Sequence, residues 1–296
     1  MQEERALRTI AVVGAGIVGL SAAIAFARAL PKVRVTVLVS PPDPAALADR
    51  LSGTLTSVHG FHVVTGIEES ELVRLGAATH RLGTRFEHWS ADGAPWYHAY
   101  GDYGRDGAGI GFHNLWVQAR RSGRAGPFDR YSAAALLAEA GKFVHPSEDP
   151  QSPLSTYSYA LRLDPERYRE LLLQIAARAR LARIDGSVAA VERREDGGVA
   201  AILLGNGRRL EADLFVDCGG PSAPLLSRID DRFEDWSRWH AADRLLIGAA
   251  ANPEGVSSCD SAVASSLGWR WTAPLGERKL VTFAYAAALT GEARAR

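Results

Sequence analysis

An apolar run near the N-terminus is followed by a glycine-rich turn and then by further apolar stretches. Ile10–Val13 has the β-branched character of a strand that is buried on both faces. The segment Leu20–Ala27 favours a helix, and Val33–Val39 has the pattern of a second buried strand. This order of strand, turn, helix and strand predicts the first βαβ unit of a parallel, doubly wound sheet.

The middle of the chain lacks long periodic stretches. Residues 50–160 are rich in Gly, His, Tyr and Trp, which predicts loops and short elements that carry binding residues. A regular helix is expected next, because Asp164-Pro165-Glu166 has the residue types of a helix N-terminus. Apolar side chains recur behind it at helical spacing, at Tyr168, Leu171, Leu172, Ile175 and Ala179.

Three apolar segments separated by glycine-containing turns follow this helix. They lie at Ser187–Arg193, Val199–Leu204 and Leu210–Val216, and they predict a small antiparallel meander. The third segment leads into Asp217-Cys218-Gly219-Gly220. In a chain with a Rossmann-type start, an acid and paired glycines after a strand favour a second contact with a dinucleotide, and the preceding meander favours FAD over NAD. The alternative is a Gly-Gly turn that binds nothing.

The turn Gly14-Ala15-Gly16-Ile17-Val18-Gly19 gives each of its glycines a role in dinucleotide binding. Gly14 permits the tight turn, Gly16 lets backbone N–H groups approach a pyrophosphate, and Gly19 lets the helix pack closely on the sheet. The phosphates are expected at the helix N-terminus, where unpaired N–H groups favour negative charge.

One part of the dinucleotide pattern is missing. An Asp or Glu usually ends the second strand and binds a ribose hydroxyl, but Val39 and Ser40 stand there. Ser40 offers a single hydroxyl in its place, which predicts weaker binding rather than none.

Composition excludes several classes of protein. The 296 residues carry 34 Lys+Arg and 34 Asp+Glu, which removes any electrostatic argument for nucleic acid or an anionic membrane as partner. Two cysteines are too few for a disulfide scaffold, so a cytoplasmic location is expected. The uncharged run Thr9–Ala27 is broken by three glycines, which argues against a membrane anchor or signal peptide.

Candidate metal ligands and nucleophiles form no recognised pattern. His59, His62, Cys218 and Cys259 do not have the spacing of a metal site, so no metal is expected. No nucleophile elbow is present for a Ser-His-Asp triad.

Several ordered motifs resemble the flavin-dependent halogenases of the tryptophan halogenase family, from Ile10 almost to the C-terminus. The segment Gly268–Leu275 looks like the family's Trp-x-Trp-x-Ile-Pro signature, and Trp96–Gly101 looks like its Tyr-Phe-His-x-Phe-Gly segment. Further matches lie at Gly66–Glu69, Ala78–Trp89, Leu214–Gly220 and Phe233–Ser237. The resemblance implies an α/β, Rossmann-like fold of the FAD-binding flavoprotein monooxygenase type with an antiparallel β-meander.

The resemblance also implies a reaction and its co-substrates. In this family reduced FAD, supplied by a separate flavin reductase, reacts with O2 and halide to give hypohalous acid. This acid travels through a tunnel to an electron-rich aromatic, indole-like small molecule. The expected partners are therefore the reductase, in transient contact, and that substrate, with a homodimer left open.

Site residues follow from the matched motifs. Arg81 stands where the family has a lysine that binds hypohalous acid or forms a haloamine. The implied FAD contacts are Gly14, Ala15, Gly16, Ile17, Gly19, Ser40, Val188, Asp217, Gly219 and Gly220. The implied substrate contacts are His98, Tyr100, Trp269 and Trp271. These four could instead be ordinary packed aromatics, and Arg81 could be a solvated surface cation.

Four departures from the family pattern make the activity doubtful. Arg81 is permanently charged and a poor amine nucleophile, and the three lysines of the chain lie elsewhere, at Lys32, Lys142 and Lys279. The loop Leu51–Thr56 lacks the acid and proline of the family's Gly-Glu-Ala-Thr-x-Pro sequence, and Ala273 replaces the signature isoleucine. Relatives are also expected to continue past residue 296 with a catalytic glutamate, much of the halide site and the flavin-ring contacts.

The expected organisation has four parts. Residues 1–50 form the FAD-binding Rossmann segment, 51–160 an inserted substrate region, 161–230 the second part of the FAD domain, and 231–296 the start of a truncated substrate domain. Three other functions stay open: an FAD-dependent monooxygenase of an aromatic substrate, an inactive flavin-binding fragment and, last, an NAD-dependent dehydrogenase that would use only the first forty residues.

Overall fold

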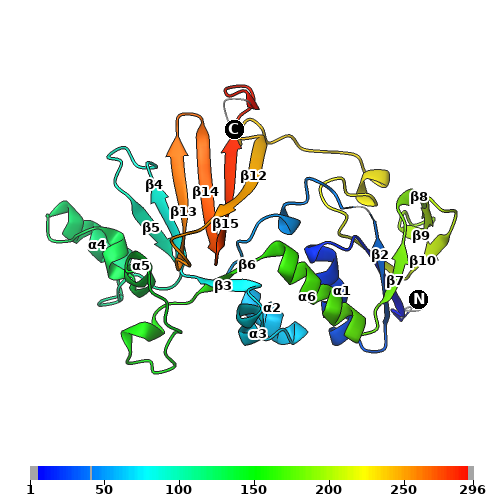
Figure 1. The fold of residues 1–296 in the computed structure, drawn as a ribbon, viewed down its shortest axis with the longest axis horizontal. Coiled ribbons are helices and arrows are strands. Elements are labelled where there is room, and N and C mark those ends of the chain that lie inside the picture. The colour runs from blue at the N-terminus through cyan, green and yellow to red at the C-terminus, as the bar shows by residue number, and fades with distance from the viewer. Residues whose placement is uncertain (1–5, 41, 293–296) are drawn as a thin grey trace. The chain divides into compact units, whose positions relative to one another are not determined.

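A computed structural model describes residues 6–40 and 42–292, which fall into two compact units (Figure 1). The first unit comprises the described residues up to Leu51, residues 61–77 and residues 164–234. The second comprises residues 52–60, residues 78–163 and the described residues from Asp235 onward. The two segments 51–160 and 231–296, expected as separate regions, thus contribute mainly to one unit.

A four-stranded parallel sheet of order β11-β1-β2-β7 forms the centre of the first unit. Its strands are β1 (Thr9–Val13), β2 (Arg34–Val39), β7 (Ala182–Asp185) and β11 (Leu214–Asp217). Helices α1 (Ile17–Ala29) and α6 (Pro165–Arg178) lie side by side against this sheet (Figure 1). Helix α3 (Glu69–Arg74) belongs to the same unit, and α2 (Val58–Thr65) is divided between the two units. The βαβ unit expected from the sequence is confirmed.

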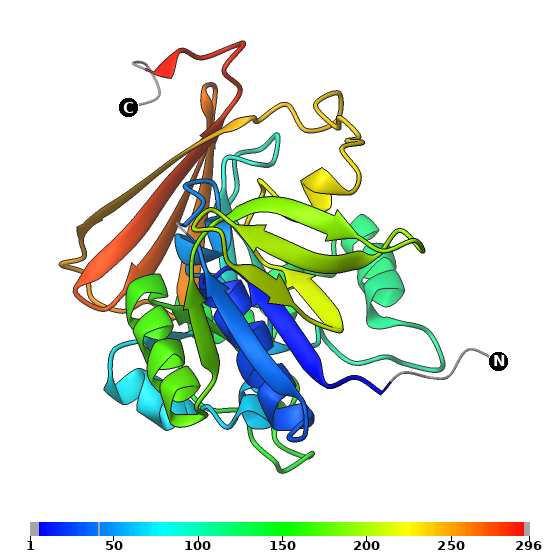
Figure 2. The same cartoon turned by 90° about the vertical axis from the view of Figure 1, so that its right-hand side faces the viewer.

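Both faces of the parallel sheet are covered, as the continuous apolar strands predicted. Ile10, Val12 and Val35 pack in one cluster with Ala23 of α1. Val13 points to the opposite face and packs against the predicted meander. The meander is an antiparallel sheet of order β10-β9-β8 (Figure 2). Its strands are β8 (Val188–Arg193), β9 (Val199–Leu204) and β10 (Arg209–Glu211).

The expected third strand, Leu210–Val216, is in fact two strands. β10 ends at Glu211 in the meander, and β11 begins at Leu214 and joins the parallel sheet beside β1. Asp213 stands at the change of direction. Its Oδ2 accepts hydrogen bonds from the backbone N–H of Arg8 at 3.0 Å and from the N–H and Oγ1 of Thr9, both at 2.9 Å. The carboxylate therefore ties the start of β11 to the start of β1.

A six-stranded mixed sheet of order β12-β15-β14-β13-β4-β5 forms the second unit, together with the pair β3-β6. The strands are β3 (Ala78–Arg81), β4 (Gly83–Glu87), β5 (Trp96–Ala99), β6 (Ala160–Leu163), β12 (Arg244–Ala251), β13 (Cys259–Ser265), β14 (Gly268–Leu275) and β15 (Arg278–Tyr285). β13 runs parallel to β4, so residues about 175 positions apart in the sequence become neighbours. Helices α4 (Phe112–Arg121) and α5 (Ala133–Glu139) belong to the same unit.

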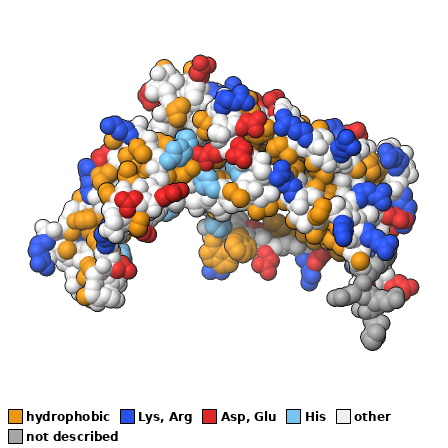
Figure 3. Space-filling model, turned by 90° about the horizontal axis from the view of Figure 1, so that it is seen from below, with side chains coloured by type: hydrophobic (Ala, Val, Ile, Leu, Met, Phe, Trp, Pro, Cys, Tyr) orange, Lys and Arg blue, Asp and Glu red, His pale blue; other side chains and the backbone are white. Residues whose placement is uncertain are grey.

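Surface properties agree with the balanced composition. Figure 3 shows one face on which acidic side chains lie among basic ones. Among the described residues, no helix combines the length and apolar character that crossing a bilayer requires.

Replacing Asp213 with Ala is expected to lower the free energy of unfolding by about 2–3 kcal/mol, because three hydrogen bonds lose a charged acceptor. Urea denaturation followed by circular dichroism measures the change. Asp185→Ala is the matched control, since this carboxylate at the end of β7 is 76% exposed and should cost no more than about 0.5 kcal/mol. Equal stability of the two variants would contradict the role of Asp213.

Candidate functional site

A pocket of about 250 Å³ opens in the first unit at the carboxyl ends of three parallel strands. This edge is where open α/β sheets bind ligands. Three segments provide most of its wall, one following each of β1, β2 and β11. The lining residues are Gly14–Gly16, Ser40, Pro42, Asp43, Ala46, Asp49, Arg169 and Cys218–Gly220.

Close backbone approach shapes this pocket. Gly14 has φ +107°, and a Cβ there would collide with the carbonyl oxygen of Cys218. A Cβ on Gly19 would collide with the carbonyl oxygen of Gly14, so the helix packs against the turn only because Gly19 has no side chain. The tight turn at Gly14 and the close helix packing at Gly19 that the sequence predicted correspond to these contacts. Gly14 and Gly16, next to the N-terminus of α1, therefore line the pocket with backbone alone.

The structure brings six of the ten residues expected to contact FAD into this lining: Gly14, Ala15, Gly16, Ser40, Gly219 and Gly220. Asp217 lies just behind it. Its carboxylate accepts N–H hydrogen bonds from Gly219 at 3.1 Å, Leu225 at 2.8 Å and Leu226 at 3.1 Å, so it holds the turn. Ile17 and Gly19 belong to α1, and Val188 lies in the meander strand β8, outside the lining.

Sequence reasoning missed the three charged residues of the pocket. Arg169 comes from α6, and its Nε donates a hydrogen bond to the carbonyl oxygen of Ala15 at 3.2 Å. Asp43 follows β2, and the N–H groups of Ala45 and Ser222 lower the pKa of its carboxyl group. Asp49 ends the short 3-10 helix Leu47–Asp49. No motif marks any of them, because their segments meet only in the folded unit.

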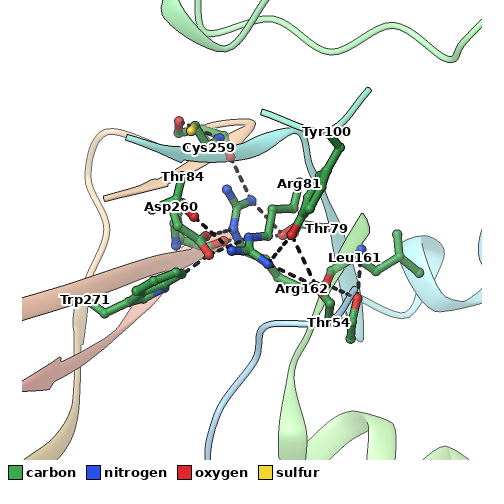
Figure 4. Close-up of polar contacts among 12 residues, drawn as sticks. Thr54, Thr79, Arg81, Thr84, Tyr100, Leu161, Arg162, Cys259, Asp260 and Trp271 are labelled. Carbon is green, nitrogen blue, oxygen red and sulfur yellow. Dashed lines mark hydrogen bonds and ion pairs between the residues drawn. The ribbon is translucent and has the colours of Figure 1, made fainter. Parts of the chain in front are cut away.

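The second unit contains a buried cluster of charged and aromatic side chains around Asp260, which is 1% exposed (Figure 4). Asp260 lies on β13. Its Oδ2 lies 2.7 Å from Nε of Arg81 on β3 and accepts a hydrogen bond of 3.1 Å from Nε1 of Trp271 on β14. Its Oδ1 accepts a hydrogen bond from Nε of Arg162 on β6. One carboxylate thus joins side chains from three other strands.

Arg81 is 7% exposed and uses most of its N–H groups. Besides the ion pair with Asp260, Nη1 donates to the hydroxyl of Tyr100 at 2.7 Å and to the carbonyl oxygen of Thr54 at 3.0 Å. Nη2 donates to Oγ1 of Thr84 at 2.9 Å. The solvated surface cation considered from the sequence is therefore wrong, because burial and these partners hold the guanidinium in place.

Arg162 carries the second positive charge of the cluster and is fully buried. Its Nη1 donates hydrogen bonds to the carbonyl oxygens of His80 at 2.9 Å and Ser257 at 2.8 Å. Two guanidinium groups therefore share one carboxylate, and backbone carbonyl dipoles carry part of the compensation.

The aromatic residues predicted to line a substrate site lie around this cluster. The guanidinium carbon of Arg81 is 5.4 Å from the ring centroid of Trp271 and 5.5 Å from that of Tyr100. Trp269 and Trp271 point to the same face of β14, with ring centroids 6.2 Å apart, and Arg270 is exposed on the other face. The expected sharing of a face is thus present.

His98 and Tyr100 are the other two residues predicted to contact a substrate. His98 is exposed and stands directly opposite Thr84 in the β4-β5 ladder. The two residues therefore share a face of the sheet, and Thr84 is one of the residues that Arg81 hydrogen-bonds. Burial raises the pKa of the Tyr100 phenol, which keeps it protonated at neutral pH. Burial and the neighbouring Asp260 carboxylate raise the pKa of the Cys259 thiol to about 12, so the thiol stays protonated at neutral pH.

Comparison with known proteins gives a consistent result. A family model described as tryptophan halogenase matches residues 9–296. Tryptophan 7-halogenase KtzQ of Kutzneria sp. (strain 744) is 26% identical, over 98% of this chain and 57% of its own length. Tryptophan 7-halogenase RebH of Lentzea aerocolonigenes is also 26% identical, over 90% of this chain and 53% of its own.

Solved structures show the same relationship. BrvH, a flavin-dependent halogenase from Brevundimonas sp. BAL3, superposes with a TM-score of 0.88 and 34% identity, over 98% of this chain and 58% of that protein. Xcc4156, a flavin-dependent halogenase from Xanthomonas campestris, has a TM-score of 0.88 and 29% identity. The chain therefore spans a little over half the length of the relatives it matches.

Replacing Asp260 with Asn is expected to lower the free energy of unfolding by about 3–5 kcal/mol, because two buried guanidinium groups lose their counter-charge. Urea denaturation monitored by tryptophan fluorescence measures the loss. Glu87→Gln serves as the control: its ion pair with Arg85 at 2.6 Å is partly exposed, and its removal should cost at most about 1 kcal/mol. A similar small loss in both variants would show that the Asp260 cluster contributes little to stability.

Proposed function

The chain belongs to the tryptophan halogenase family, and from this membership we propose that it serves flavin-dependent halogenation of an electron-rich aromatic compound. The observation that carries the proposal is the family match over residues 9–296, together with a dinucleotide-type pocket and the Trp-x-Trp strand. The substrate class is an aromatic, indole-like small molecule. A separate flavin reductase is the proposed source of reduced cofactor.

The residues that line the pocket of the first unit support FAD as its proposed ligand. Gly14 and Gly16 have no side chains of their own at the N-terminus of α1, where a pyrophosphate would bind in place of the Asp49 carboxylate. Arg169 adds a positive charge to the lining, and Gly219 and Gly220 bring a second backbone segment to it. When bound, reduced FAD supplies the reaction with O2 that oxidises halide. The residues of this chain bind and orient it.

Arg81 and the aromatic residues around it form the proposed substrate-side part of the site. The guanidinium of Arg81 is a permanent cation, so it offers positive charge and N–H donors but no amine that could carry a halogen. The phenol of Tyr100 stays protonated, because burial raises its pKa, and it accepts one of the Arg81 hydrogen bonds. Trp269, Trp271 and His98 would then contact an aromatic substrate.

The engagement of Arg81 specifically favours a second function, FAD-dependent monooxygenation of an aromatic substrate. Its Nε, Nη1 and Nη2 all contact partners within the second unit, so few donors are left for hypohalous acid. Oxygen insertion needs no halogen carrier at this position. A chain that binds flavin but gives no product would represent the third option, an inactive flavin-binding fragment.

Arg169 is the residue whose replacement tests the flavin pocket. The purified chain is expected to quench FAD fluorescence on binding, and Arg169→Ala should weaken FAD binding about tenfold, because a cation is lost beside the pyrophosphate. Arg178→Ala, an exposed arginine of the same helix outside the pocket, should leave the affinity unchanged. Absence of FAD binding by the unmodified chain would overturn the flavin-dependent function.

Product masses separate halogenation from oxygenation. The chain is incubated with reduced FAD, O2, bromide and an indole, and product masses are measured with and without bromide. Halogenation predicts a brominated product that disappears without bromide. A hydroxylated product that forms regardless of bromide would favour the monooxygenase, and no product despite FAD binding would favour the inactive fragment.

A further inference from the structure

A carboxylate already occupies the N-terminus of α1. Oδ1 of Asp49 accepts a hydrogen bond of 2.6 Å from the backbone N–H of Ile17, the first residue of the helix. The cap residue Gly16 has no side chain to do this, and the first turn of α1 contains no acid. The helix therefore takes its N-terminal acceptor from a residue 32 positions further along the chain.

The carboxylate of Asp49 lies where the proposed function expects a pyrophosphate. A Cβ built on Gly16 would overlap Oδ2 of Asp49, so the carboxylate lies in the space that this glycine leaves open. Asp49 also lines the same pocket as Gly14, Ser40 and Gly219. A backbone N–H donates one hydrogen bond, so the N–H of Ile17 cannot serve a carboxylate and a pyrophosphate at full strength together.

Charge makes the competition stronger. Asp43 adds a second carboxyl group to the lining, with a pKa lowered by hydrogen bonds from Ala45 and Ser222. Arg169 is the positively charged residue of that lining. A ligand with two phosphate charges therefore enters a pocket whose own anions outnumber its cations, and like charges in proximity oppose binding.

We propose that Asp49 sets the affinity of this pocket for pyrophosphate-bearing ligands, acting as an internal anion that a pyrophosphate must displace. This inference rests on the proposed function, in which the pocket binds FAD. It assigns the chain a lower affinity for FAD and ADP than the glycine turn alone would provide. The nucleoside part of the ligand, which does not need the N–H of Ile17, is unaffected.

The test compares adenosine, ADP and FAD binding to the full chain and to Asp49→Asn and Asp49→Ala by calorimetry. Asp49→Ala vacates the position and should bind ADP and FAD about tenfold more tightly, while adenosine affinity changes by less than about twofold. Asp49→Asn keeps the hydrogen bond but removes the charge, so an intermediate gain is expected. The free Asp49→Ala protein should also have a lower Tm, because α1 loses its acceptor.

These opposite movements of stability and ADP affinity distinguish competition from a structural role. If Asp49 only ordered the loop, Asp49→Ala would lower the Tm and the ADP affinity together, which would overturn the inference. Asp185→Asn is the matched control: it removes an exposed carboxylate of the same unit that does not line the pocket, so it should leave the ratio of ADP to adenosine affinity unchanged.

The remaining outcomes separate this inference from the function on which it rests. FAD binding by the unmodified chain with an unchanged ADP to adenosine ratio in both Asp49 variants would overturn the inference and leave the flavin pocket standing. If adenosine, ADP and FAD all failed to bind to every variant, the pocket would not be a dinucleotide site, and both proposals would fall.

Discussion

Three strands of the second unit present a donor to the carboxylate of Asp260. Arg81 on β3, Arg162 on β6 and Trp271 on β14 all meet it, and Asp260 itself is on β13 (Figure 4). The two-stranded sheet is thereby joined to the six-stranded sheet through side chains. Burying two guanidinium groups is tolerated because this carboxylate and several carbonyl oxygens surround them. The same contacts fix the orientation of Trp271 and of Arg81, on which any substrate chemistry in this unit would depend.

The chemistry open to Arg81 follows from this arrangement. A guanidinium has donors on three nitrogens, so Arg81 can pair with Asp260 and still reach Thr84, Tyr100 and Thr54. A lysine ammonium at the end of a flexible stem could not span these partners at once. The arginine is thus integrated into the packing of the unit to a degree that a mobile catalytic amine would not be. The proposed role of Arg81, which is positive charge and orientation without covalent catalysis, rests on this arrangement.

The first unit depends on a different constraint, the close approach of backbone segments. Gly14 and Gly19 allow the turn, the helix and the segment after β11 to meet, and this creates a nucleotide-type pocket. Its charges come from elsewhere. Asp43 and Asp49 lie in the segment after β2, and Arg169 lies on α6. Asp49 accepts the hydrogen bond of the Ile17 N–H at the N-terminus of α1, so the proposed pyrophosphate would have to compete with this carboxylate.

The sequence alone determined the elements that depend on short-range patterns. The strand Ile10–Val13, the glycine turn behind it and the helix after Asp164 were all predicted, because local periodicity and capping residues specify them. The tertiary structure decided what lies far apart in the chain. Asp213 divides an expected single strand by bonding to Thr9, 204 positions away, and Asp260 meets Arg162 across 98 positions. Periodicity shows which side of an element is buried, but it does not show which distant side chain will share that interior. Arg81, Arg162 and Asp260 meet only through such long-range contacts.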